Sequence, residues 1–316
     1  MKYLISFVLG AVISLILGPI IIPFLKSMNA GQSIREDGPE SHLTKAGTPT
    51  IGGLIFLSSF LIANIVMTNF SVDFLIVLFA TLAFGSVGFI DDYIKVVKKR
   101  NLGLTAIQKL LLQILFCLVV LYFQYNSKEL STEVYVPFIK KMVSFNYFYI
   151  PFIIFVIVGV VNSVNLTDGL DGLSSGVTTI VLLFLAAVAI KLERYSIAIA
   201  SFVLAGALVG FLKFNKFPAQ VFMGDTGSLA LGGAVSSIAV LLNIPLLLPI
   251  ACGVYFIETL SVILQVLSYK IRGKRIFLMS PLHHHFEQKG WKETKVVKVF
   301  YLAQLILCII GYLLII

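Results

Sequence analysis

The chain has 316 residues, of which 59% are hydrophobic and only 12% are charged, and its mean hydropathy is +1.00. A soluble protein of this length needs more polar groups to cover its surface, so the composition excludes a soluble enzyme, a disordered protein and a nucleic-acid-binding protein. An integral membrane protein remains. Three cysteines, Cys117, Cys252 and Cys308, lie in apolar runs without paired spacing, which indicates buried side chains rather than a disulfide or zinc site.

Ten apolar runs approach the length of a membrane-spanning helix, which needs about 20 apolar residues. Helices are expected because they satisfy their own backbone inside lipid, and the runs lack the alternation of a barrel. The first run contains Pro19 and Pro23 and no small-residue cleavage site, so we interpret it as a span rather than a signal peptide. The expected spans are 3–25, 51–68, 74–90, 105–125, 147–164, 173–190, 197–212, 226–242, 246–268 and 296–316.

The basic residues orient this bundle. If both termini lie outside the cell, the inner loops hold 18 of the 24 Lys and Arg residues, as the positive-inside rule requires. The net charge of +9 then follows from topology, with some attraction to anionic lipid, and needs no nucleic acid. The outer segment 126–146 contains Thr132-Glu133-Val134-Tyr135-Val136, which indicates a short strand or hairpin. We therefore expect one polytopic all-α domain, residues 1–316, with extracytoplasmic termini and a polar site at the cytoplasmic face.

Polar residues gather at the inner ends of these spans. A single aspartate there is readily explained as a helix cap or a lysine partner. Several together, in segments rich in Gly and Asn, favour a functional site. The residues concerned are Asp91, Asp92, Asp168, Asp171 and Asp225, and the four histidines His42, His283, His284 and His285.

The third span closes on Asp91-Asp92-Tyr93-Ile94-Lys95. On a helix, Lys95 lies four residues from Asp91 and three from Asp92, so the three share a face. Two adjacent carboxylates repel each other unless a cation lies between them. The pair is therefore suited to hold Mg²⁺, or to act as base or nucleophile.

The fifth span closes on a polar run from Asn162 to Leu173, in which Asn162, Asn165, Asp168 and Asp171 recur every three positions. These side chains would align if the helix end tightened to 3₁₀ geometry. Glycines between them permit close approach of a ligand to the backbone. The alternative is a glycine-rich turn with capping residues.

The loop from Phe214 to Ser228 ends in Asp225-Thr226-Gly227-Ser228, where the eighth helix should begin. Asp225 is either a cap of that helix or a ligand of a metal that bridges it to a diphosphate. The basic loop that follows contains His283-His284-His285, which is either a plain polar loop or a place where one or two histidines contact phosphate. Within the ninth span we expect structural hydrogen bonds for Glu258 and Gln265.

With these motifs, the chain resembles the polyprenyl-phosphate N-acetylhexosamine-1-phosphate transferase family over essentially its whole length. The Asp-Asp-x-x-Lys site, the run from Asn165 to Gly172 and the segment from Phe222 to Ser228 carry the resemblance. The segments 47–53 and 281–287 are similar to the branch that uses UDP-N-acetylmuramoyl-pentapeptide.

The resemblance implies a Mg²⁺-dependent reaction at the cytoplasmic face of the bacterial cell membrane. UDP-N-acetylmuramoyl-pentapeptide gives its phospho-sugar to undecaprenyl phosphate, which forms lipid I and UMP, and a homodimer is a further expectation. The metal would lie on Asp225, with Asn165 as a second ligand. The other implied roles are acceptor chemistry for Asp91 and Asp92, phosphate binding for Lys95 and Lys109, diphosphate contacts for His283, His284 and His285, and a uridine pocket of Lys45, Asp168, Gly169, Asp171, Asn215 and Phe222.

Two mechanisms remain open, and so do two other functions. Asp91 could deprotonate the lipid phosphate for direct attack, or Asp92 could attack first and form an aspartyl-phosphate. A relative that uses UDP-N-acetylglucosamine is one alternative function. A secondary transporter is the other, although transporters keep their polar sites near the bilayer midplane.

Overall fold

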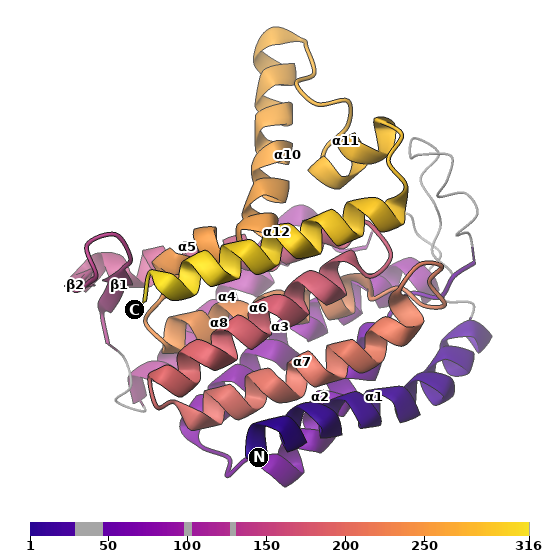
Figure 1. The fold of residues 1–316 in the computed structure, drawn as a ribbon. Helices are drawn as coiled ribbons and strands as arrows, with labels where there is room; N and C mark the ends of the chain where they lie inside the picture. Colours follow the sequence, from indigo (N-terminus) through magenta and orange to yellow (C-terminus); the bar gives the residue numbers. More distant parts are fainter. Residues whose placement is uncertain (29–46, 98–102, 127–130, 316) are drawn as a thin grey trace.

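The computed structural model describes residues 1–28, 47–97, 103–126 and 131–315 (Figure 1), and every apolar run that it covers is helical. This confirms the all-α class. The long helices are α1 (Lys2–Ser27), α2 (Gly53–Met67), α3 (Val72–Val97), α4 (Ala106–Asn126), α5 (Tyr149–Thr167), α6 (Leu173–Lys191), α7 (Tyr195–Asn215), α8 (Gly224–Leu241), α10 (Gly253–Arg272) and α12 (Glu293–Leu313). The short ones are η2 (Asn146–Phe148), η3 (Pro245–Leu247), α9 (Leu248–Ala251) and α11 (Leu282–Gln288).

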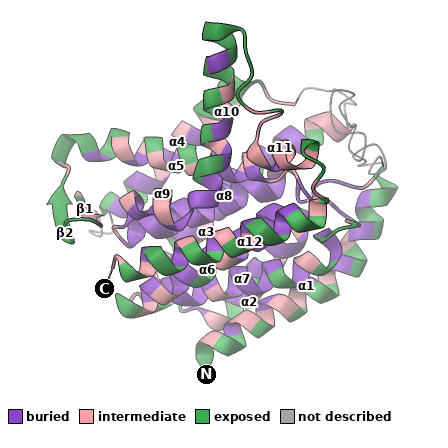
Figure 2. Cartoon of the chain, turned by 45° about the horizontal axis from the view of Figure 1, so that its top comes forward, coloured by how far each residue is buried: buried purple, intermediate pink, exposed green. Residues whose placement is uncertain are grey.

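Eight of the described helices are long and apolar enough to cross a membrane. Helix α2 has only 15 residues, and α8 has 18 and begins with polar side chains. The chain is thus a multi-helix membrane protein, while the count of ten spans stays a prediction. The outer helices have many exposed residues (Figure 2). Large apolar side chains are common among them, as lipid contact requires.

Helix α8 forms the centre of the bundle, and every residue from Thr226 to Leu241 is buried. Glycines let its neighbours approach closely, as small residues do between membrane helices. A Cβ on Gly88 of α3 would overlap the backbone of Asp225, and a Cβ on Gly232 would overlap the backbone of Val161 on α5. The backbones of α3, α5 and α8 therefore meet at van der Waals contact, which fixes the polar residues at their ends.

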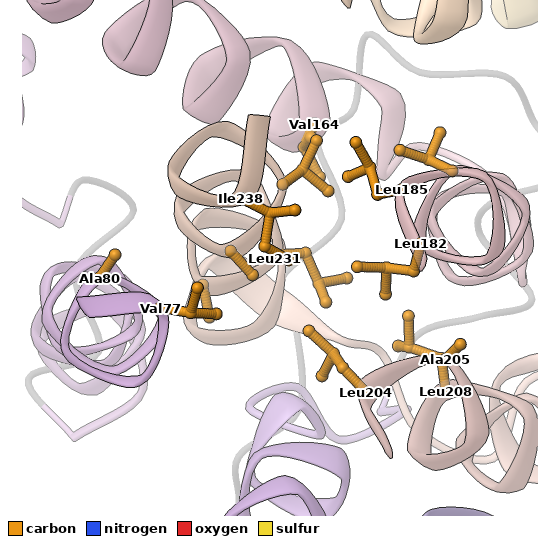
Figure 3. Packing of buried hydrophobic residues seen from close by; sticks show 14 of the residues in the cluster. Val77, Ala80, Val164, Leu182, Leu185, Leu204, Ala205, Leu208, Leu231 and Ile238 are labelled. Carbon is orange, nitrogen blue, oxygen red and sulfur yellow. The ribbon is translucent and has the colours of Figure 1, made fainter. Parts of the chain in front are cut away.

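The core around α8 is filled by branched aliphatic side chains from several helices (Figure 3). Leu231 and Ile238 of α8 lie between Val77 of α3 on one side and Val164 and Leu182 of α5 and α6 on the other. All five are completely buried. Since lipid is as apolar as these side chains, close packing rather than water exclusion holds them together.

Helices α1 and α7 run in the same direction along each other. Gly10 lies against Val203, and eight residues further along α1 Gly18 lies against the ring of Phe214. The start of α1 therefore lies at the same end of the bundle as the start of α7.

The same end carries the C-terminus and a two-stranded hairpin. Strand β1 (Glu133–Val136) pairs antiparallel with β2 (Lys141–Ser144), which confirms the hairpin expected in this segment. The Tyr135 hydroxyl donates to the carbonyl oxygen of Leu314 at 2.8 Å. Both termini thus share one end of the bundle, opposite the aspartates, and the side of the membrane that this end faces stays a prediction.

The apolar run 246–268, expected as one span, is divided. Helix α9 stops at Ala251, Cys252 has non-helical backbone angles, and α10 starts at Gly253. Gly253 follows the break directly, and glycine tolerates such a bend better than other residues do. Beyond it, α10 leaves the bundle at a steep angle to the other long helices (Figure 1).

Gln304 of α12 satisfies the backbone groups freed by this break. Its Nε2 donates to the carbonyl oxygen of Ala251 at 2.5 Å, and its Oε1 accepts from the N–H of Val254 at 3.3 Å. Non-helical backbone inside a membrane protein needs such partners, since lipid offers none. One buried amide therefore stabilises the bend that directs α10 outward.

Candidate active site

Three carboxylates meet where α3 ends and α8 begins. Ligand oxygens of Asp91, Asp92 and Asp225 lie within 4.8 Å of one another. Asp91 and Asp92 are buried, and the Asp225 side chain is 17% exposed. The close approach of α3 to α8 at Gly88 brings these residues together across more than 130 positions of sequence. This acidic cluster could hold a metal ion.

Two lysines lie between the carboxylates of the cluster. Lys95 Nζ is 2.6 Å from Asp91 Oδ2 and 3.2 Å from Asp225 Oδ2. Lys109, at the start of α4, is 2.6 Å from Asp225 Oδ2 and 3.1 Å from Asp91 Oδ2. When all five groups are ionised, the three negative charges of the carboxylates exceed the two positive charges of the ammonium groups. The excess negative charge in a buried place favours a further cation.

The two adjacent aspartates have different surroundings. Asp92 accepts hydrogen bonds from the N–H of Asp225 at 3.2 Å, the N–H of Thr226 at 2.9 Å and the Thr226 hydroxyl at 2.7 Å. It therefore satisfies donors that the start of α8 leaves unpaired. Asp91 faces the lysines with Oδ2 and accepts the N–H of Leu104 with Oδ1 at 2.7 Å. Asp92 orients the helix that carries Asp225, while Asp91 pairs with the ammonium groups of both lysines.

Asn165 joins the cluster from the end of α5. Its Nδ2 donates to Asp225 Oδ1 at 2.9 Å and to the Ser228 hydroxyl at 2.8 Å. The amide nitrogen thus faces Asp225, whereas a metal ligand needs the oxygen, which a half-turn of the amide would present. Asn165 as a ligand stays a prediction.

The idea that a 3₁₀ end of α5 aligns its polar residues is wrong. Helix α5 stays α-helical to Thr167, after which the chain turns. Asn162 consequently points away and donates to Gln113 Oε1 at 2.8 Å. The period of three therefore does not mark one face, and Asn165 alone of the helical members reaches Asp225.

The turn after α5 borders the acidic cluster. Burial raises the pKa of Asp168 to about 8, and the negative charges of Asp225, Asp92 and Asp171 act in the same direction. The turn ends at Gly172, whose φ of +78° lies in the left-handed region that glycine adopts without strain. The raised pKa favours the neutral form of Asp168 at neutral pH, beside the carboxylates of the cluster.

The polar side chains behind this turn hold the loop between α7 and α8. Asp171 Oδ2 accepts the N–H of Ala219 at 2.9 Å. Asn215 accepts the Ser175 hydroxyl at 2.7 Å and donates to the carbonyl oxygen of Val221 at 3.1 Å. Both expected site residues are buried, and these contacts shape the loop that Phe222 occupies.

The loop containing Phe222 pairs with the segment before α2. The Phe222 N–H donates to the carbonyl oxygen of Pro49, and the Gly52 N–H donates to that of Phe222, both at 2.8 Å. The Phe222 side chain is partly exposed. Lys45, the remaining residue expected in this pocket, lies outside the described residues.

The three histidines of α11 have three different surroundings. His283 is buried and its Nδ1 lies 3.1 Å from Glu258 Oε2 of α10. His284 Nδ1 lies 2.8 Å from Glu287 Oε2 on the same helix. His285 Nδ1 accepts the N–H of Leu278 at 3.1 Å, and partial burial lowers its pKa. The sequence does not distinguish these neighbours, because their difference depends on the course of α10.

The structural hydrogen bonds expected within the ninth span are confirmed. Gln265 accepts the N–H groups of Ile276 and Phe277 and donates to the carbonyl oxygen of Phe277, which fastens the loop after α10. Glu258 binds His283 through both carboxylate oxygens.

Several contributors were not expected from the sequence. Thr226 donates to Asp92, and the Ser228 hydroxyl accepts from the amide of Asn165. Glu293 of α12 accepts the N–H of Asp171 at 2.7 Å. The run of small polar residues after Asp225 was a sequence signal that could have identified Thr226 and Ser228. No sequence signal pointed to Glu293, because its helix is remote in sequence from the site.

The sequence matches the family model described as glycosyl transferase family 4 over residues 74–243. A protein of Alkaliphilus metalliredigens (strain QYMF) is 53% identical, and one of Alkaliphilus oremlandii (strain OhILAs) is 54% identical, each over 98% of this chain and 96% of its own. One of Clostridium perfringens (strain 13 / Type A) is 50% identical over 98% of both chains. All three are named phospho-N-acetylmuramoyl-pentapeptide-transferase. These relatives confirm the resemblance carried by the motifs, and the chain belongs to glycosyl transferase family 4.

Proposed function

We propose that this chain transfers phospho-N-acetylmuramoyl-pentapeptide from UDP-N-acetylmuramoyl-pentapeptide to undecaprenyl phosphate, which yields lipid I and UMP in peptidoglycan synthesis. The observation that carries the proposal is the cluster of three carboxylates and two lysines at one end of a membrane bundle. A lipid phosphate acceptor needs a site at the membrane surface, and a diphosphate donor needs cations there. Relatives of this name that align over nearly the whole chain support the same reaction.

Mg²⁺ is the proposed cofactor. The donor set fits it, because Asp91, Asp92 and Asp225 offer hard carboxylate oxygens within 4.8 Å of one another and carry excess negative charge. Asp225 is the proposed ligand, with Asn165 as the second. When bound there, Mg²⁺ supplies positive charge against the donor diphosphate and the departing UMP.

The acceptor reacts by direct attack in our proposal. Asp91 takes the proton of the lipid phosphate, and an oxygen of that phosphate bonds to the β-phosphorus of the donor. The bond from this phosphorus to the bridging oxygen breaks, and UMP leaves with that oxygen. Lys95 and Lys109 hold phosphate oxygens in line, exchanging their contacts with carboxylates for contacts with substrate.

The surroundings of Asp92 support direct attack over an aspartyl-phosphate. Both its oxygens accept hydrogen bonds from the first residues of α8, so a covalent bond there would disrupt the start of the helix. The acceptor phosphate is already a competent nucleophile once aligned and deprotonated. Asp92 therefore serves as an orienting group for Asp225.

In our proposal the donor nucleoside binds in a pocket beside the acidic cluster. Asp168, Gly169 and Asp171 form its turn, and Asn215 shapes the loop that presents Phe222. The partly exposed ring of Phe222 stacks on uracil, as aromatic side chains do on bases. His284 and His285 are partly exposed on α11 and are proposed to contact the diphosphate region. Lys45, which lies outside the described residues, is proposed as a further nucleoside contact from the motif resemblance alone.

The site faces the cytoplasm of a bacterial cell, because 18 of 24 basic residues then lie inside. Single cysteines at Ser144 of the hairpin and at Lys289 after α11 should react with an impermeant reagent from opposite sides of the membrane. Reaction from the same side would contradict this orientation. The homodimer stays a prediction. Measuring the molar mass of the detergent-solubilised protein would test it.

The direct test is release of UMP from UDP-N-acetylmuramoyl-pentapeptide by the purified protein. We expect release only when undecaprenyl phosphate and Mg²⁺ are both present, and we expect that UDP-N-acetylglucosamine does not replace the donor. Release from UDP-N-acetylglucosamine would assign the other branch. Uptake of the nucleotide into proteoliposomes without UMP release would point to a transporter instead.

A further inference from the structure

A buried acid–base pair joins two helices beside the proposed donor pocket. Glu258 of α10 and His283 of α11 have side-chain exposures of 0% and 1%. Glu258 Oε1 accepts the backbone N–H of His283 at 3.2 Å, and Oε2 lies 3.1 Å from the ring Nδ1. One carboxylate therefore fixes both the start of α11 and the rotation of the imidazole ring.

The far side of the same ring lies against the turn after α5. His283 Nε2 is buried and has no hydrogen-bond partner in the described part of the chain. It contacts Gly169 so closely that a Cβ on this glycine would overlap Nε2. Gly169 stands between Asp168 and Asp171, which border the acidic cluster and hold the loop of Phe222. The imidazole thus fills the space between α10 and the turn.

The neighbouring histidines lack these features. His284 is bound by Glu287 of its own helix, and its side chain is 15% exposed. His285 accepts a backbone N–H from the loop after α10. Among the three, His283 alone is clamped by an acid from another helix and covered by the turn.

We propose that Glu258 and His283 are positioning residues that hold the turn at Asp168 to Asp171 in its nucleotide-binding shape, and that His283 does not itself touch the diphosphate. This rests on the proposed function, since the turn is taken as the wall of the donor nucleoside pocket. The contact between Glu258 Oε2 and Nδ1 fixes the orientation of the ring, and with it the atom that faces Gly169. Loss of the acid frees the ring, and the glycine that packs on it loses its support.

The test separates nucleoside binding from phosphate chemistry. Glu258→Gln keeps the size of the side chain but cannot accept hydrogen bonds with both terminal atoms. We expect its KM for UDP-N-acetylmuramoyl-pentapeptide to rise about tenfold, as for other groups that orient a ligand contact. The inhibition constant of uridine, which has no phosphate, should rise by the same factor, while kcat and the KM for undecaprenyl phosphate change less than about twofold.

A steric pair of variants tests the contact at Gly169. Gly169→Ala should weaken uridine inhibition at least as much as Glu258→Gln, because the new Cβ overlaps the imidazole. In a His283→Ala background, where the ring is absent, the added methyl of Gly169→Ala should have no further effect. Independent, multiplying effects of the two substitutions would overturn the inference.

Thr259→Val is the matched control. Thr259 follows Glu258 on α10 and donates to the Ser163 hydroxyl at 2.7 Å, so its loss loosens α10 against α5 without touching the pair. We expect a lower melting temperature with unchanged uridine inhibition.

A fall in kcat with unchanged uridine inhibition in Glu258→Gln would overturn the inference and assign His283 to the diphosphate. Failure of the proposed function gives a different result. In that case the wild-type protein releases no UMP, whatever the response of uridine binding to Glu258→Gln.

Discussion

The two ends of the bundle carry ion pairs of opposite character. At the hairpin end, Arg194 binds Asp73 through two hydrogen bonds of 2.6 and 2.9 Å, and one positive charge meets one negative charge. At the other end, two lysines face three carboxylates, two of them buried. The pair of Arg194 and Asp73 ties the start of α7 to α3 with one charge of each sign. An unbalanced buried cluster favours a further cation or a proton on one of its carboxylates, and a cation there would attract an anionic substrate.

The largest effect is expected from Asp225→Asn, which removes the excess charge of the unbalanced end. Turnover should fall by more than about 1000-fold, because the charge stabilisation supplied by a metal amounts to several kcal/mol. The protein should remain folded, as its melting temperature would show, and EDTA should abolish wild-type activity until Mg²⁺ is restored. Asp73→Asn is the same chemical change at the balanced end, and it should leave turnover within about twofold. Equal losses of turnover in Asp225→Asn and Asp73→Asn would contradict the functional difference between the two ends.

The adjacent aspartates should differ in their dependence on pH. Asp91→Asn should lose about 100-fold in turnover at pH 6, a usual size for removal of a general base. Part of the lost turnover should return above pH 7. The second ionisation of a phosphate lies near pH 6, so the acceptor is then already deprotonated and needs no base.

The alternative role of Asp92 is tested by a burst experiment. Without acceptor, the wild-type enzyme should release no stoichiometric UMP and retain no phospho-sugar. Asp92→Asn should act through the position of Asp225, with no pH recovery. A burst that leaves label on Asp92 would replace direct attack with the covalent route.

A smaller effect is expected from the neutral aspartate beside the cluster. Because the pKa of Asp168 is raised from 3.8 to about 8, the folded protein binds more protons than the unfolded chain between these values. Stability from this group is therefore lost as pH rises through that window. In EDTA, the melting temperature of Asp168→Asn should exceed that of the wild type by a margin that grows by a few degrees from pH 5 to pH 8. A margin independent of pH would mean that Asp168 is ionised throughout.

The smallest effect is expected at the balanced end. Arg194→Gln should cost about 1 kcal/mol, because the pair is partly exposed and its ions are partly solvated. For a chain of 316 residues that corresponds to a fall in melting temperature of about 1–2 °C, with turnover unchanged. The double variant Arg194→Gln with Asp73→Asn should have the same melting temperature as the single variants if the two side chains stabilise the protein only through each other.

Much of the unbalanced end could be predicted from sequence. Asp91, Asp92 and Lys95 share a helical face by their spacing alone, and the polar residues after Asp225 mark a helix start. The arrival of Lys109 between Asp91 and Asp225 follows from helix packing, which no local pattern encodes. The role of Lys109 was expected only from the family resemblance, because residue spacing does not predict it.

The course of α10 was the main feature that local reasoning missed. Apolar composition continues through residues 246–268, so the run reads as one helix although Gly253 permits a break. Whether the break forms depends on Gln304, a residue of another helix. The pairing of Glu258 with His283 depends on the same bend and was hidden for the same reason.

The bend at Cys252 also turns α10 away from the other long helices (Figure 1). Its exposed side chains include Leu260, Ile263, Leu267 and Ile271. A helix that stands apart from its neighbours offers surrounding lipid more of its surface than a helix inside the bundle does. The helix that carries Glu258 is therefore open to contact with lipid along much of its length.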